Sequence, residues 1–507
     1  MPDRRRRLGV STALPAGGAA GIDPAAIRAF VEAAEQVAEL HTLAISHRGT
    51  TVAQAQWAPY SLDRPQLVYS VSKTITAMTV GALLHQDGGA SISLDDPILD
   101  HLPAPGITPA PAWHDVTIEH CLAMATGHTA DAWNRAWAGP GPLPAPLLDL
   151  MLATPPQRPP GTVFAYNQVA TNLLSRMVTH VTGAPLRRVA HERVLGPLGL
   201  PEPGWFTDAT GIDQGWSGAH VRTGDLLTLG RFWLRDGCTE DGTRLLPGGF
   251  LDRATTPFAP LPEAWTRGAW TRGYGYSFWI LDAGFRADGA FGQFAVVLPA
   301  ADLVVAITSI STDMHGLGEL ILTHLLPGVG REPAPEDASL APFLADRSLP
   351  LLPAAGTAPA GLPAWHPLAP PAAVPVAGAP PAAPSAPPPD ATDVPVAGFD
   401  AVSLPAPGEP LRLRYAGTEL ALVVPTHSWG ETVLRAPAGP YAGTAVRVLA
   451  QGGWSDGTYR ARLRIPSFPH HVLVTGDAAS ASVVWPIAPL NGADLFAASP
   501  ERAGLSA

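Results

Sequence analysis

A stretch rich in proline and alanine divides this 507-residue chain into two parts. The composition changes from about Pro327, and residues 379–389 read Ala-Pro-Pro-Ala-Ala-Pro-Ser-Ala-Pro-Pro-Pro. Such a stretch cannot bury a core, so residues 329–400 are expected to form an extended, semi-rigid linker. The chain is therefore predicted to fold as two units, over residues 23–328 and residues 401–507.

The part before the linker mixes helical and strand patterns. Asp23 and Pro24 are typical of an N-cap and the first position of a helix, and apolar spacing continues to Leu40. Further helices are predicted over residues 70–86, 117–124, 173–181 and 225–236, and strands over 42–46, 51–57, 274–281, 294–298 and 303–309. Helices lying between an early hairpin and late strands predict an α+β fold, with an antiparallel sheet built from both ends of the domain and flanked by helices.

The part after the linker contains only strand patterns. Short segments with strand propensity are separated by Gly, Asp and Pro turns, over residues 411–415, 420–424, 445–450, 459–465, 471–474 and 481–485. Residues 401–507 are therefore predicted to form a small all-β domain.

Charge and composition exclude several classes of partner. A net charge of −11 argues against a nucleic-acid partner or an anionic membrane surface. No run of eighteen apolar residues predicts a membrane span. Residues 1–22 are expected to be a flexible tail, and Arg4–Arg7 within it leaves export as a minority alternative to a cytoplasmic location. Cys121 and Cys238 are too few for a disulfide framework and are expected to fill core space.

The tetrapeptide Ser70-Val71-Ser72-Lys73 opens the long apolar helix predicted over residues 70–86. Residues three apart share one helix face, so the amine of Lys73 can reach the Ser70 hydroxyl. Burial and the positive helix terminus would both lower the pKa of that amine and make it a base. Ser70 and Lys73 are thus a candidate nucleophile and base, although this pattern also occurs by chance.

Two later motifs carry candidate partners for this pair. In Gly161–Gln168, the phenol of Tyr166 could relay a proton to Ser70 if the lysine lowers its pKa, or could be an ordinary buried aromatic group. In Arg286–Gln293, the glycines could let the backbone approach a substrate, or could form an ordinary turn. Trp265, Trp270 and Tyr274 could form an apolar acyl pocket or pack in the core.

The order and spacing of these motifs resemble the serine β-lactamase-like family, which includes class C β-lactamases, D-alanyl-D-alanine carboxypeptidases, D-aminopeptidases and related esterases. The resemblance covers about residues 20–328. It extends to Leu94-Asp95-Asp96-Pro97, to Met124-Ala125-Thr126-Gly127 and to Leu298-Pro299-Ala300-Ala301-Asp302-Leu303-Val304-Val305. It implies a β-lactamase/transpeptidase-like fold with an all-helical subdomain.

The resemblance also implies roles for single residues. Ser70 would be the nucleophile, Lys73 and Tyr166 the proton-transfer pair, and the Ser70 and Ala290 backbone amides the oxyanion hole. Gln168, Asp288, Gly289 and His128 are the candidate substrate-binding residues, and His128 could equally serve as a cap or core residue. No cofactor is implied, and neither the histidines in general nor His470-His471 show the spacing of a metal site.

Two positions depart from the family pattern. Gln168 stands where the family has Asn, and Ala287 stands where β-lactamases carry the Lys of Lys-Thr-Gly. Losing that cation argues against penicillin hydrolysis, and strand alternation should turn Arg286 to the face opposite residue 287, so that it does not replace the lysine. A carboxylate of Asp288 facing the substrate would favour a free amine.

Two functions remain open from the sequence. The first is a serine hydrolase that cleaves an ester or amide of a small molecule or peptide through an acyl-enzyme on Ser70. The second is a penicillin-binding-type receptor, or a catalytically impaired binding protein of the same fold, with Gln168 and Ala287 as marks of lost turnover.

Overall fold

A computed structural model describes residues 21–84, 92–131, 146–208, 210–266, 268–331, 340–368, 393–406, 408–490 and 492–506. These residues form two compact units. The first unit holds the described residues of Met1–Gln56 and Val68–Arg347, and the second holds those of Trp57–Leu67, Ser348–Ala377 and Pro387–Ala507. Most of the expected N-terminal tail lies outside the described residues. Its last residue, Ile22, is buried and forms a β-bridge with Val329.

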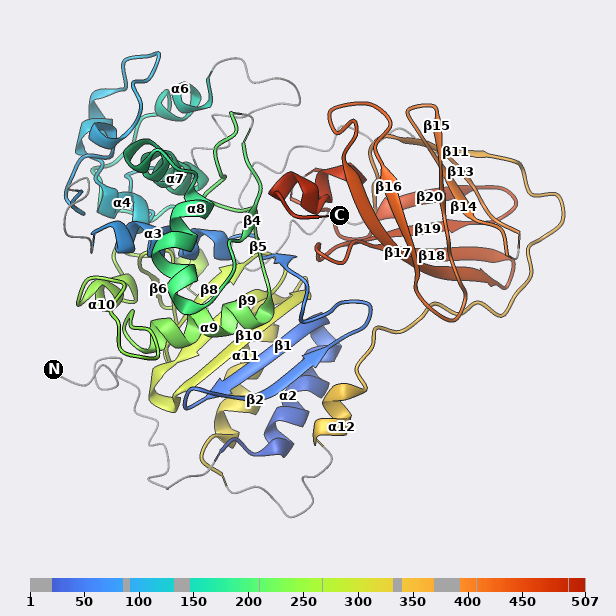
Figure 1. The fold of residues 1–507 in the computed structure, drawn as a ribbon, viewed down its shortest axis with the longest axis horizontal. Coiled ribbons are helices and arrows are strands. Elements are labelled where there is room, and N and C mark those ends of the chain that lie inside the picture. Colours follow the sequence, from blue (N-terminus) through green and yellow to red (C-terminus); the bar gives the residue numbers. More distant parts are fainter. Residues whose placement is uncertain are drawn as a thin grey trace. The chain divides into compact units, whose positions relative to one another are not determined.

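The first unit is built on a seven-stranded antiparallel sheet in the order β2-β1-β10-β9-β8-β7-β6 (Figure 1). Its strands are β1 (Glu39–His47), β2 (Thr50–Gln56), β6 (Gly273–Tyr274), β7 (Trp279–Ile280), β8 (Phe285–Gly289), β9 (Gln293–Leu298) and β10 (Leu303–Ile310). Residues from both ends of the unit meet where β1 pairs with β10, for example Ala44 with Ala306. The predicted α+β fold, with a sheet built from both ends of the domain, is confirmed.

Helices cover both faces of this sheet, since every residue of β10 is buried. Helix α9 (Thr223–Leu234) packs on β1, β9 and β10, while α2 (Pro24–Val37) packs on β1 and on α11 (Met314–Leu320). The N-cap prediction for α2 is confirmed, because the Asp23 side chain accepts a hydrogen bond from the Ala25 amide at 2.9 Å.

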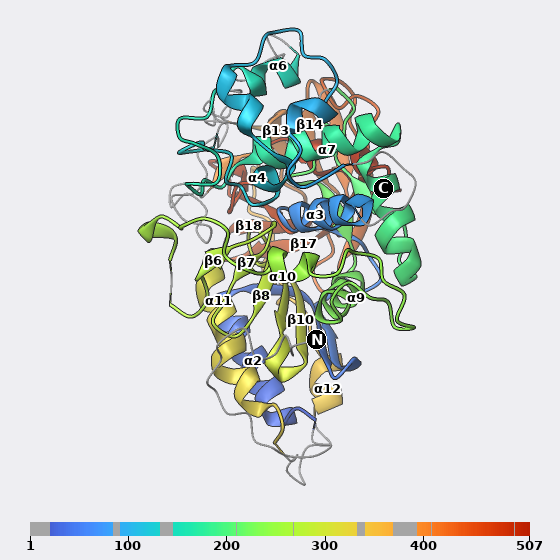
Figure 2. The ribbon, with the colours of Figure 1, turned by 90° about the vertical axis from the view of Figure 1, so that its left-hand side faces the viewer.

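A second group of helices forms the all-helical part of the unit (Figure 2). It comprises α3 (Val71–Leu84), α4 (Ile118–Leu122), α6 (Leu147–Leu152), α7 (Gln168–Thr182) and α8 (Leu186–Ala190), and it is followed by the short elements β4 (Gly204–Trp205), β5 (Ala219–Val221) and α10 (Phe250–Ala254). Helix α3 is buried at every position from Val71 to Ala82, as its all-round apolar sequence predicts. The last two residues of the helix predicted over 70–86, and Gly88 and Gly89 after it, lie outside the described residues.

One predicted strand of the first unit is wrong. Residues 274–281 do not form a single strand, but turn between β6 and β7. The Ala254 carbonyl oxygen accepts a hydrogen bond from the Tyr276 amide of this turn at 3.0 Å, and only glycine fits beside it at position 275, because a Cβ there would lie 2.0 Å from that oxygen. Ser277 in the same turn has a φ of +57°.

The second unit contains two antiparallel sheets, which bear out the all-β prediction. One sheet has the order β11-β13-β14-β15 and the other the order β12-β20-β19-β18-β17-β16. The strands are β11 (His366–Pro367), β12 (Val394–Pro395), β13 (Phe399–Ser403), β14 (Leu411–Tyr415), β15 (Thr418–Leu422), β16 (Gly430–Arg435), β17 (Ala445–Ser455), β18 (Thr458–Arg464), β19 (His471–Gly476) and β20 (Ala481–Trp485). Burial alternates along β14 and β19, as in a sheet with one face on a core.

The two units include residues outside the expected ranges 23–328 and 401–507, and one segment of the first range belongs to the second unit. The interval 329–400 contains α12 (Leu340–Ala345), β11 and β12, and its centre, residues 369–392, lies outside the described residues. The segment Trp57–Leu67, which includes β3 (Gln66–Leu67), follows β2 in the sequence but groups with the second unit. Among the described helices, none has the length and apolar character needed to cross a bilayer.

Candidate active site

Lys73 lies in the first turn of α3 and Ser70 directly precedes this helix, with their side chains in contact. Nζ of Lys73 donates a hydrogen bond to Oγ of Ser70 at 2.9 Å, as the spacing of three positions predicts. Ser70 is half-buried, whereas Lys73 is 1% exposed. The residue before the nucleophile, Tyr69, has a φ of +46°, a left-handed conformation that costs energy for a residue other than glycine. Tyr69 is buried with its ring edge-on to Phe291.

The surroundings of Lys73 bring the deprotonation of its amine close to neutral pH. Burial lowers the pKa of Lys73 to about 7, and the carboxylates of Asp131 and Asp288 oppose this shift. Nζ also donates to the Trp216 carbonyl oxygen at 2.7 Å, which holds the amine beside Ser70. The expected lowering of the Lys73 pKa by burial therefore appears in the structure.

Tyr166 reaches the same place from the turn before α7. Its hydroxyl is hydrogen-bonded to Ser70, and its ring centroid lies 4.8 Å from Nζ of Lys73. The expected lowering of the phenol pKa is wrong. Burial raises the pKa of Tyr166, and the nearby carboxylates of Asp288 and Asp131 raise it further. Tyr166 is therefore a neutral phenol over the physiological range of pH.

Arg286 and Asp288 on β8 form a buried ion pair beside this cluster. Nε of Arg286 donates to Oδ2 of Asp288 at 2.8 Å, with the two side chains 2% and 6% exposed. Burial raises the pKa of Asp288 to about 6, against the effects of Arg286 and Lys73. Because Asp288 interacts electrostatically with Lys73 and Tyr166, the strand face that carries residues 286 and 288 is the one turned to the site.

This placement corrects the expectation that residue 287 faces the site and Arg286 faces away from it. Ala287 is fully buried in the hydrophobic core on the opposite strand face, so a side chain there would not reach the site. Arg286 is the cation on the site face, but its charge is balanced by Asp288. Its guanidinium also donates to the Trp270 carbonyl and lies 4.4 Å from the Trp270 ring centroid.

The end of β8 lies against the backbone that leads into Ser70. A Cβ on Gly289 would fall 2.1 Å from the Val68 carbonyl oxygen, so only glycine permits this approach. The next residue, Ala290, and Ser70 each have a backbone amide that donates no backbone hydrogen bond among the described residues. The Ser70 and Ala290 amides therefore lie on two segments that are in close contact, and neither amide is used in a backbone hydrogen bond among the described residues.

His128 and Gln168, two of the expected substrate-binding residues, differ in their surroundings. His128 is 1% exposed, with Nε2 3.1 Å from the Thr154 carbonyl oxygen and Nδ1 2.8 Å from Oγ1 of Thr126. Its two ring nitrogens serve internal hydrogen bonds, which favours the alternative of a core or capping residue for His128. Gln168 starts α7, and its Oε1 is buried without a hydrogen-bond partner. Asn167 before it is the N-cap and accepts from the Val169 amide at 3.0 Å.

Aromatic rings surround Tyr166. Trp265 and Trp279 lie nearly parallel to its ring, with centroids at 6.0 Å and 5.8 Å, and Tyr274 meets it edge-on at 6.1 Å. Trp265 keeps partial exposure, whereas Tyr274 and Trp279 are buried. Of the three aromatic residues considered for an acyl pocket, Trp265 and Tyr274 contact Tyr166, and Trp270 instead stacks on Arg286.

Sequence reasoning missed three contributors to this cluster. Asp131 is 4% exposed, accepts from the Gln168 amide at 3.1 Å, and lies in a region without a recognisable motif. Trp216 contributes a backbone carbonyl, which no side-chain pattern can reveal. Trp279 was hidden in a predicted strand. Within the described ranges, no group of three or more His, Cys, Asp and Glu side chains is placed to hold a metal ion.

The fold and this cluster define an α+β domain of the β-lactamase/transpeptidase class. A family model described as Beta-lactamase matches residues 26–321, which is more than half of the chain, and the protein belongs to that family of hydrolases. No curated protein matches the chain.

Solved structures with a similar fold include three proteins of low sequence identity. SurE is 17% identical, with 91% of this chain and 98% of that chain covered and a TM-score of 0.48. The octameric penicillin-binding protein homologue from Pyrococcus abyssi is 15% identical, with coverages of 90% and 98% and a TM-score of 0.46. EstCE1, a hydrolase with promiscuous acyltransferase activity, is 17% identical, with coverages of 61% and 99% and a TM-score of 0.47.

Proposed function

We propose that the protein is a serine hydrolase that cleaves an ester or amide bond of a small molecule or peptide through an acyl-enzyme on Ser70. One observation carries this proposal: the amine of Lys73, with a pKa of about 7, lies 2.9 Å from the Ser70 hydroxyl oxygen. A base with a pKa near the working pH is the most effective proton acceptor, and such catalysis contributes about 10²–10⁴-fold in rate.

The residues divide the reaction between them. The neutral Lys73 amine takes the proton of Ser70 while an N–H still donates to the Trp216 carbonyl, and the serine oxygen attacks the substrate carbonyl carbon. The Ser70 and Ala290 amides stabilise the resulting oxyanion. The Tyr166 phenol gives its proton to the leaving group and regains one from the Lys73 ammonium. Water then hydrolyses the ester of Ser70 by the same groups in reverse.

The ion pair on β8 bears on the substrate class. Asp288 is paired with Arg286, so the site face presents neither a free cation for a substrate carboxylate nor an isolated carboxylate for an amine. Together with the aromatic rings around Tyr166, this supports substrates whose acyl group is apolar and uncharged. The substrate would bind beside Gln168, Asp288 and Gly289.

Labelling with a fluorophosphonate tests whether Ser70 is reactive. The full chain should be labelled once, at Ser70, and the Ser70→Ala variant should not be labelled. The same protein should release p-nitrophenol from a short-chain ester as a burst followed by steady turnover. A burst without turnover would favour the penicillin-binding-type receptor. An unlabelled protein would contradict the hydrolase and favour a catalytically impaired binding protein of the same fold. A panel of short acyl esters, D-amino-acid amides and a chromogenic cephalosporin then identifies the substrate class.

A further inference from the structure

We infer that Thr76 is a positioning residue for the proposed general base, because its hydroxyl holds the loop that orients the Lys73 amine. This inference rests on the proposed function, since it concerns the rate at which Ser70 is acylated. The loop comprises residues 213–218, directly before β5. Its Trp216 carbonyl accepts from Nζ of Lys73 at 2.7 Å.

Two hydroxyl groups of α3 bind this loop and the strand residue that follows it. Oγ1 of Thr76 lies 2.9 Å from the Gly215 carbonyl oxygen and 3.0 Å from the Ser72 carbonyl oxygen, and its single proton is shared by these two acceptors. Oγ of Ser72 accepts from the Ala219 amide at 2.9 Å. Both hydroxyl residues are fully buried. Because positions 72 and 73 lie four and three residues before position 76, their side chains share a helix face with that of Thr76.

The loop also lies against α7. Oγ of Ser175 donates to the Asp213 carbonyl oxygen at 2.6 Å, and Ser175 is fully buried. A Cβ on Gly215 would fall 2.4 Å from the Thr171 carbonyl oxygen, so the loop backbone packs directly on this helix. Helices α3 and α7 thus both hold the loop.

The Thr76 hydroxyl acts close to the acceptor of the Lys73 amine. Gly215 and Trp216 are neighbours, so their carbonyl groups belong to consecutive peptide units, one bound by Thr76 and the next by Lys73. Peptide units are planar, and only the φ and ψ angles of Trp216 separate these two carbonyl groups. A shift of the Gly215 carbonyl is therefore passed on to the Trp216 carbonyl.

The Trp216 carbonyl sets the direction of the lone pair on the Lys73 amine. A neutral amine has two N–H groups and one lone pair, and it rotates about the Cε–Nζ bond. An N–H held by the Trp216 carbonyl restricts this rotation and allows the lone pair to face Oγ of Ser70, which lies 2.9 Å from Nζ. Loosening the loop should therefore slow proton transfer from Ser70, with no change in how the substrate binds.

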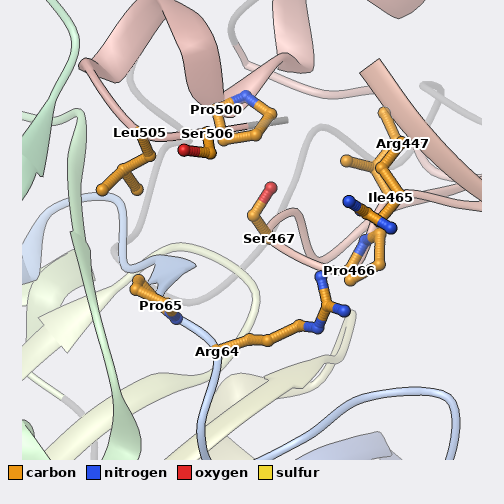
Figure 3. A pocket seen from close by; sticks show the side chains of 9 residues that line it. All are labelled: Arg64, Pro65, Arg447, Ile465, Pro466, Ser467, Pro500, Leu505 and Ser506. Carbon is orange, nitrogen blue, oxygen red and sulfur yellow. The ribbon is translucent and has the colours of Figure 1, made fainter. Parts of the chain in front are cut away.

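The contacts between α3, α7 and the loop all lie within the first unit. The second unit holds a cavity of about 170 Å³, lined among others by Arg447, Ile465 and Ser467 (Figure 3). No residue of α3 or of the loop lines that cavity. The effect of Thr76 on Lys73 is therefore local to the first unit.

The test uses the full chain with Thr76→Val, Thr76→Ser and a matched control, Thr79→Val. Valine has nearly the shape of threonine but no hydroxyl, whereas serine keeps the hydroxyl and loses the methyl group. Thr79 is buried on the same helix, and its hydroxyl donates to the Ile75 carbonyl of that helix at 2.8 Å, so its removal should leave the loop in place. Fluorophosphonate labelling over a range of probe concentrations gives the limiting rate constant, the half-saturating concentration and the labelled fraction.

We expect Thr76→Val to lower the limiting rate constant about three- to tenfold, the range that a single hydrogen bond supports, with an unchanged half-saturating concentration and complete labelling. Thr76→Ser should rescue the rate, because it returns a hydroxyl to the Gly215 carbonyl. A limiting rate constant of Thr76→Val equal to that of Thr79→Val would overturn the inference.

Two further results would count against Thr76 as a positioning residue. Equally slow labelling of Thr76→Ser and Thr76→Val would show that packing of the methyl group matters and the hydroxyl does not. A smaller labelled fraction of Thr76→Val, with an unchanged rate constant for the reactive protein, would mark a purely structural role. An unlabelled wild-type protein would instead contradict the proposed function, and with it this inference.

Discussion

Arg286 and Asp288, two positions apart on β8, form a buried ion pair with 2.8 Å between Nε and Oδ2 on the strand face that borders Lys73. The pair places a balanced charge on the face of β8 that is turned to the site. It also makes Asp288 a neighbour of the proposed base, which gives the carboxylate an influence on the pH dependence of the reaction.

The pH profile of the wild-type protein should rise with the deprotonation of Lys73. The neutral amine is the active form, so kcat/KM should increase with pH through a midpoint of about 7 and then level off. The raised pKa of Tyr166 should keep the phenol protonated across this range. Measuring ester hydrolysis from pH 5 to pH 9 checks this, and a profile that is flat across pH 7 would contradict Lys73 as the base.

Replacing Asp288 by Asn should move that midpoint to lower pH. The Asp288 carboxylate stabilises the Lys73 ammonium, so its removal lowers the pKa of Lys73 and leaves more neutral amine at acidic pH. The measured quantity is the midpoint of kcat/KM against pH. Asp282→Asn is the control, since Asp282 pairs with Arg272 at the surface. A midpoint shifted to higher pH would refute the electrostatic link.

Gly289→Ala should abolish most of the activity. Its Cβ would fall 2.1 Å from the Val68 carbonyl oxygen, so β8 must move away from the segment that carries Ser70. A misplacement of about 1 Å costs on the order of 10²-fold in rate. Gly248→Ala is the matched control, because a Cβ there meets no atom within 4 Å. Full activity in Gly289→Ala would show that β8 and Ser70 need not be in contact.

His128→Ala should reduce stability without changing substrate affinity. The buried Thr154 carbonyl would lose its side-chain partner and the Thr126 hydroxyl would lose one of its two, at about 1–3 kcal/mol in the free energy of unfolding. Urea unfolding measures the loss, and KM of the folded variant should equal that of wild type. His114→Ala at an exposed position should cost less than about 0.5 kcal/mol. A raised KM with unchanged stability would restore His128 to substrate binding.

Much of the fold followed from local patterns. Three features could be predicted because each depends only on residues close together in the sequence. They are the all-round apolar sequence of α3, the Asp23 cap of α2 and the alternation in the last strands. The strand predicted over residues 274–281 is wrong for the opposite reason, since the turn between β6 and β7 makes a hydrogen bond with the distant carbonyl of Ala254.

The sequence by itself determined the Ser70 and Lys73 contact, because three positions on a helix bring two side chains together whatever surrounds the helix. Only the tertiary structure decided what that contact can do. The burial that lowers the Lys73 pKa, the Trp216 carbonyl that orients the amine, and the pairing of Asp288 with Arg286 all depend on segments far apart in the chain. Such contacts follow from packing, and no local pattern encodes them.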